Sequence, residues 1–225
     1  MSASIFRAAI AAALIAASPA SAGIAQPTVH FIYPAPYGTI FDRVCKEWLN
    51  RDVEQADIDE LLARKAEFEA QWRTTGAQYM RLATEATGRA FPYSEIQATM
   101  TLCTPDSMAF PLFIRMKSFL GSGTEDGGHD FPLLVFHELM HHYANAIEAK
   151  SQIFAKYADL PFSVRAHIHV VAFERYVLEK TGRIHQLEKL REYYAKDEDS
   201  TYHRAWRIVD KEGVAAVIAD AGLKP

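Results

Sequence analysis

The chain has 225 residues, of which 49% are hydrophobic, and its formal net charge at pH 7 is −4. This length is enough for one sizeable hydrophobic core, and no linker or internal repeat divides the chain. The charge is slightly negative and no basic stripe occurs, so the composition argues against a nucleic-acid partner.

The N-terminus has the three-part build of a secretory signal peptide. Arg7 supplies the positive end, and the apolar run Ala8–Ala17 is shorter than the roughly 20 residues that a membrane-spanning helix needs. Ala20–Ser21–Ala22 then forms a small-residue cleavage pattern. We therefore predict a signal peptide at 1–22 and a single mature domain at 23–225. The protein is expected to be exported, periplasmic or secreted, with no stable membrane anchor after cleavage.

Two helices and a pair of strands are predicted in the first half of the mature chain. Ile40–Asn50 reads as a short amphipathic helix, and a long packing helix follows between Asp57 and Gly88. Residues 91–103 and 108–120 are rich in β-branched and aromatic side chains, so we expect two strands in a hairpin.

The second half is predicted to be helical. One helix runs from the cap Asp130 to about Lys150, a second from near Ser163 to before Gly182, and shorter helices complete the chain. Strands followed by helices indicate an α+β domain with a small, mostly antiparallel sheet and a helical C-terminal half.

Cys45 and Cys103 are the only cysteines. An exported chain meets an oxidising compartment, so we expect the pair to form a disulfide. Two separate buried thiols are the alternative, because sequence spacing does not show how close the two backbones come.

The segment VFHELMHHYAN (135–145) has the spacing of a metal site. In a helix, His137 and His141 lie one turn apart on one face and can direct their rings at a single ion. Glu138 lies one step round the helix, where its carboxylate can take a proton from an attacking water. The flanking residues are uncharged and largely apolar, which predicts a buried helix whose polar groups need partners.

His137-Glu138-Leu139-Met140-His141 resembles the HExxH motif of the zincin metallopeptidases. The resemblance covers about a dozen residues and implies a zincin-like fold, a Zn²⁺ site and Glu138 as the catalytic residue. It also implies a peptide or protein substrate lying along an edge strand, for which 108–119 is the candidate. His142 falls outside the motif.

A catalytic zinc ion normally has three protein ligands, so one more is needed. Ile147 stands where the metzincin subgroup has its third histidine, which leaves the gluzincin arrangement with a glutamate from the next helix. Glu174 is preferred because its helical neighbours are apolar and an ionised group there needs a cation. A salt bridge to an arginine or lysine is the alternative role for Glu174, and His167 and His169 remain open as the third ligand.

A hydrolytic site also needs a donor for the developing oxyanion, and the candidates are Tyr202, His203 and Tyr194. The sequence thus predicts a zinc-dependent hydrolase, a metallopeptidase in which Glu138 activates the water. The alternative is a catalytically inactive exported protein that uses the same fold to bind a metal or a partner.

Overall fold

A computed structural model describes residues 25–222, and the predicted signal peptide lies outside the described residues. Strand β1 (Thr28–Ile32) comes first, followed by the short helices α1 (Ile40–Arg43) and α2 (Cys45–Leu49). The predicted helix at 40–50 is thus interrupted at Val44.

The predicted long helix is present with a change of pitch in its middle. Helix α3 (Gln55–Gln71) passes through a π-helical turn (Trp72–Gly76) into α4 (Ala77–Thr87). A Cβ at Gly76 would lie 2.0 Å from a ring carbon of Trp72, so the turn needs glycine at this position. As predicted, the helix stops at Gly88, whose φ of 66° places it in the left-handed region.

The sheet is parallel, which contradicts the predicted antiparallel hairpin. Strands β1, β2 (Glu95–Thr101) and β3 (Phe113–Arg115) lie in the order β1-β2-β3, and both pairings are parallel. Strand β1 lies before the two strands predicted from the sequence, and α3 and α4 form a helical crossover that joins it to β2 in parallel.

The path of the chain between β2 and β3 also differs from the predicted hairpin. Met108 and Phe113 form an isolated antiparallel bridge, so the chain reverses twice between 102 and 113. After two reversals β3 runs in the same direction as β2. The predicted strand 108–120 therefore shrinks to three residues, followed by a 3₁₀ turn (Lys117–Phe119).

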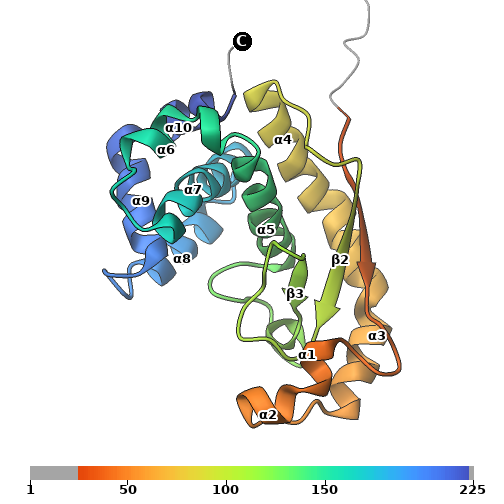
Figure 1. Cartoon of the computed structure of the whole chain (residues 1–225). Coiled ribbons are helices and arrows are strands. Elements are labelled where there is room, and N and C mark those ends of the chain that lie inside the picture. Colours follow the sequence, from red (N-terminus) through yellow and green to blue (C-terminus); the bar gives the residue numbers. More distant parts are fainter. Residues whose placement is uncertain (1–24, 223–225) are drawn as a thin grey trace, which may run out of the picture.

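The helical second half agrees with the prediction. Its helices are α5 (Phe131–Asn145), α6 (Gln152–Lys156), α7 (Phe162–Lys180), α8 (Ile184–Tyr194), α9 (Thr201–Glu212) and α10 (Val214–Ala221). Helix α5 lies between two groups of elements, with α6–α10 on one side and the sheet with α3 and α4 on the other (Figure 1). One continuous hydrophobic core joins these groups, so the described residues form an α+β domain with α5 at its centre.

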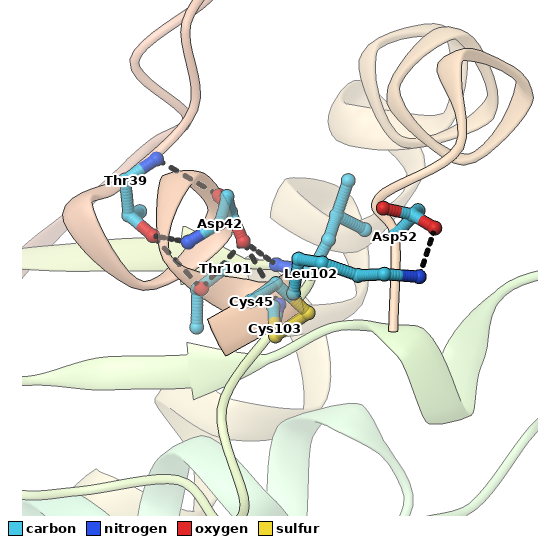
Figure 2. Close-up of a disulfide and its surroundings, with 8 residues drawn as sticks. Thr39, Asp42, Cys45, Asp52, Thr101, Leu102 and Cys103 are labelled. Atoms are coloured by element: carbon cyan, nitrogen blue, oxygen red, sulfur yellow. Dashed lines mark hydrogen bonds and ion pairs between the residues drawn. A yellow bond between two sulfur atoms is a disulfide. The ribbon is translucent and has the colours of Figure 1, made fainter. Parts of the chain in front are cut away.

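The predicted disulfide is confirmed. Cys45 in α2 is bonded to Cys103 just after β2, with their Cα atoms 5.7 Å apart. Figure 2 shows that Asp42 reinforces the same junction, since its Oδ1 accepts hydrogen bonds from the backbone N–H groups of Leu102 and Cys103, both at 2.8 Å. A disulfide of this kind is typical of proteins folded in an oxidising compartment. Among residues 25–222, no helix combines the length and the apolar character needed to cross a bilayer.

Candidate metal centre

Helix α5 carries the HExxH motif through the core of the molecule. As predicted, Asp130 caps the helix, and its Oδ1 accepts a hydrogen bond from the N–H of Leu133 at 3.1 Å. Pro132 occupies the first turn, where a missing N–H has no cost. Every residue from Phe131 to Met140 is buried, so His137 is held in a largely apolar environment, and His141 follows directly at a half-buried position.

The structure brings three histidines together at one end of a cleft. The Nε2 atoms of His137 and His141 lie 3.3 Å apart. His167 comes from α7. The centroid of its ring lies 4.5 Å from the ring centroid of His141 and 5.5 Å from that of His137. One ligand nitrogen from each of the three lies within 4.8 Å of the other two. Two imidazoles that share a tetrahedral zinc ion at 2.0–2.1 Å have nitrogens about 3.3 Å apart, so the His137–His141 pair fits such an ion, and His167 lies near enough to be a third donor.

Hydrogen bonds fix the tautomers of two of these rings. The Nδ1–H of His137 donates to Glu174 Oε1 at 2.8 Å, and the Nδ1–H of His167 donates to the Ser163 carbonyl at 2.7 Å. The acceptors are oxygens, so a proton belongs on Nδ1 of each ring, and in its neutral form each ring then has its lone pair on Nε2, where it can bind a metal.

The surroundings favour neutral rings at His141 and His167. Burial, aided by the neighbouring histidines, lowers the pKa of His141 well below its usual value and that of His167 to about 4. Burial also acts to lower the pKa of His137, but the charge of Glu174 outweighs it and raises that pKa.

Glu174 lies in the middle of a buried hydrogen-bond network. It is 0% exposed, and its Oε1 accepts from His137 and from the Nε2–H of His129 at 2.7 Å. The Tyr194 hydroxyl donates to Oε2 at 3.2 Å. Burial opposes ionisation, but the neighbouring His137 and His129 outweigh it and lower the pKa of Glu174. These contacts make His129, His137 and Glu174 a second group that could hold a metal ion.

The residues predicted as metal ligands lie in different positions around the motif. Glu174 was predicted to be the third metal ligand, and its Oε1 contacts Nδ1 of His137, on the other side of the ring from the Nε2 that faces His141. His169 turns away from the three-histidine group, because its Nε2 lies 2.8 Å from Asp220 Oδ2. His129 was not predicted to belong to the site. It lies in the irregular loop before α5, whose path no periodicity in the sequence indicates.

Glu138 stands beside the histidines with its carboxylate unengaged. It is 6% exposed, and among the described residues no hydrogen bond to its side chain is found. Burial raises its pKa, although the charges of His137 and His129 oppose the shift. A raised pKa suits a group that must take up a proton and then release it.

Glu138 and the three histidines line a cleft of about 370 Å³. Its other walls are the segment 107–110, the end of α5, Phe154 and the first turns of α7. The volume falls within the usual range for small-molecule sites, roughly 300–1,000 Å³.

The three predicted oxyanion donors lie in different places. Tyr202 lines the cleft, and its ring lies 4.6 Å from that of His167. Tyr194 stacks on Tyr202 but uses its hydroxyl on Glu174. His203 contributes its backbone N–H to the cap of α9 and does not line the cleft. Tyr202 is thus the candidate whose ring is placed beside the histidines.

His142 supports the wall of the cleft. Its Nε2–H donates to the Ala109 carbonyl at 2.7 Å, and its ring packs 4.1 Å from that of Phe110. His142 thus lies outside the three-histidine group, as expected, and its contacts attach the segment 107–110 to α5.

Comparison of the chain with protein families, with curated proteins and with solved structures finds no match in any of the three.

Proposed function

We propose that the protein is a zinc-dependent hydrolase that cleaves amide bonds, a metallopeptidase in the broad sense. The observation that carries this proposal is the cleft in which three imidazoles converge beside the unengaged carboxylate of Glu138. The resemblance of His137–His141 to the HExxH motif implies two of these imidazoles and Glu138 as the base, and we propose His167 as the third donor in place of the expected Glu174.

We assign the metal to His137, His141 and His167 rather than to the group containing Glu174. The three-histidine group opens onto the cleft, where water and substrate can enter. In the other group all three residues are buried, and the polar atoms already meet at the hydrogen-bond distances of 2.7 and 2.8 Å. Glu174 then serves as the carboxylate that orients His137 and strengthens it as a ligand.

The donor set suits zinc. Three neutral imidazoles with an open fourth position are a known catalytic arrangement for this ion. When bound, zinc lowers the pKa of water and polarises the carbonyl of the substrate.

The chain's own residues perform the remaining steps. Glu138 takes the proton from the attacking water and delivers it to the nitrogen of the leaving amine. The apolar side chains in the walls of the cleft lower the local polarity, which strengthens these electrostatic contacts. The Tyr202 hydroxyl is the donor available to the developing oxyanion, since burial raises its pKa and keeps it protonated.

We further propose that the mature protein acts outside the cytoplasm. The N-terminal signal pattern and the Cys45–Cys103 disulfide both point to an exported protein, periplasmic or secreted.

The test compares the wild type with Glu138→Gln. Both proteins are stripped with a chelator, reloaded with zinc, and analysed for metal content by mass spectrometry and for hydrolysis of a mixed peptide library. We expect one zinc ion in each protein and a loss of hydrolysis in Glu138→Gln of about 10²- to 10⁴-fold.

Glu179→Gln, an exposed change on α7 outside the cleft, is the matched control and should behave as the wild type. A wild type that refuses zinc contradicts the proposal. Zinc binding without turnover of any peptide favours the inactive metal-binding alternative.

A further inference from the structure

Arg165 lies in the cleft of the metal centre and has no assigned partner. It belongs to the first turns of α7 and lines the same cleft as His137 and Glu138. Its guanidinium stacks over the ring of Phe154, 4.3 Å from the centroid, with Phe162 at 5.9 Å. These rings hold the flat cation in place without using its N–H groups.

The guanidinium lacks an acceptor. None of the ion pairs or side-chain hydrogen bonds found among residues 25–222 includes Arg165, and its Nε is buried without a partner. Two carboxylates, Glu138 and Glu148, also line the cleft, and neither pairs with it. Arg165 is half-buried and its positive charge has no counter-charge among the described residues, so a ligand in the cleft that carries a carboxylate would supply the missing acceptor.

Arg175 on the same helix shows the more usual arrangement. It stacks 4.6 Å from the centroid of the Trp206 ring, and its Nε is likewise buried without a partner. Its terminal nitrogen, however, pairs with Asp210 Oδ1 at 2.6 Å. Both arginines stack on an aromatic ring and have a buried Nε without a partner, but only Arg175 also pairs with a carboxylate.

The edge of the sheet next to the cleft is closed to a long peptide. The N–H and the carbonyl of Phe113 both bond to Met108 at 2.9 Å, and the N–H of Arg115 bonds to Ser107 Oγ at 3.0 Å. These are outward-facing groups of β3, so an extended substrate cannot add to this edge as a strand. The expectation that 108–119 binds an extended peptide therefore has no support in this geometry.

We propose that Arg165 binds a carboxylate of the substrate, and that the substrate is a short peptide or an N-acylated amino acid with a free C-terminal carboxylate. This rests on the proposed hydrolase function. The planar fork of arginine matches a carboxylate through two parallel hydrogen bonds. Water adds to the carbonyl, the C–N bond breaks, and the amino acid that leaves takes the proton from Glu138 while Arg165 holds its carboxylate. The rings of Phe110, Phe154 and Phe162 provide an apolar wall for its side chain.

The first test measures binding to metal-free protein, so that zinc cannot hold the carboxylate. Isothermal titration calorimetry compares 3-phenylpropionate with the matched 3-phenylpropanamide. We expect the carboxylate to bind the wild type about 10- to 100-fold more tightly than the amide. Arg165→Gln should abolish this preference, Arg165→Lys should keep part of it, and the matched control Arg175→Gln should keep all of it.

Equal binding of the two probes, no detectable binding of either, or a preference that survives in Arg165→Gln would each overturn the assignment. Melting temperatures of all variants are recorded, and Arg165→Lys provides the decisive comparison if Arg165→Gln does not fold.

The second test uses zinc-loaded protein and compares kcat/KM for N-benzoyl-glycyl-phenylalanine and its C-terminal amide. We expect faster cleavage of the free acid by the wild type and equal, slow cleavage of both by Arg165→Gln. If neither compound is cleaved by any variant while the metal-free protein still prefers the carboxylate, the hydrolase proposal fails and the anion site stands. If both are cleaved at equal rates by the wild type, the anion site fails and the hydrolase stands.

Discussion

At the residue scale, His137 is the side chain on which the site depends. One of its ring nitrogens faces His141 at 3.3 Å, and the other donates to Glu174 at 2.8 Å. The His137 ring thus belongs to the three-histidine group through one nitrogen and bonds to the fully buried carboxylate of Glu174 through the other. This arrangement gives the buried carboxylate of Glu174 a hydrogen-bond donor and holds the His137 ring in one orientation.

The assignment of His167 as third ligand predicts an order of zinc affinities. His167→Ala should weaken zinc binding as strongly as His141→Ala, because each removes a ligand. Glu174→Gln should weaken it only about 10- to 100-fold, the usual effect of losing a carboxylate that supports a ligand. His169→Ala should leave the affinity unchanged.

Competition with a chromophoric chelator measures all four variants, and their melting temperatures are recorded on the same samples. If Glu174→Gln lost zinc as completely as His141→Ala while His167→Ala retained it, Glu174 would be the ligand, as the sequence alone suggested.

At the element scale, Asp220 ties three helices together. From α10, its Oδ1 accepts the N–H of Gln152 at 2.8 Å at the start of α6, and its Oδ2 accepts from Ser151 at 2.5 Å and from His169 of α7 at 2.8 Å. Burial alone would raise the pKa of Asp220, but the hydrogen bonds from His169 and Ser151 outweigh it and lower the pKa to about 2.

Asp220→Asn should therefore destabilise the protein in a pH-dependent way. The ionised carboxylate stabilises the fold above its unfolded pKa of about 3.9, and this contribution is lost as the pH falls through 2. We expect a loss of about 2 kcal/mol in the free energy of unfolding at pH 7, shrinking between about pH 4 and pH 2. Urea unfolding at pH 7 and pH 3 measures this difference in the free energy of unfolding, with Asp159→Asn, a change at an exposed residue, as the control. A difference that stays constant across this range would contradict the role given to the charge.

At the scale of the whole molecule, the disulfide connects α2 to the end of β2 across 58 residues of chain. This loop contains α3, α4 and the crossover that makes the sheet parallel. Because the bond limits the freedom of so long a segment in the unfolded chain, its removal should cost about 4 kcal/mol.

Urea unfolding of the double variant Cys45→Ala/Cys103→Ala measures this cost. Added reductant should lower the stability of the wild type towards that of the variant and should leave the variant unchanged. Equal stability of the oxidised wild type and the variant would show that the bond contributes nothing.

The sequence by itself determined those features that depend on local periodicity and on composition. A helix repeats every 3.6 residues, so His137 and His141 must share a face wherever the helix lies. The cap at Asp130, the stop at Gly88 and the pairing of the only two cysteines were likewise predictable from residue types and neighbours.

Only the tertiary structure decided how separate elements meet. The direction of the strands depended on a crossover and on two chain reversals, which no residue pattern specified. Which of His167, His169 and Glu174 faces the motif depended on the rotation and crossing of α7 against α5. Such angles are set by the packing of many side chains at once, and a single helix's sequence constrains only its own faces.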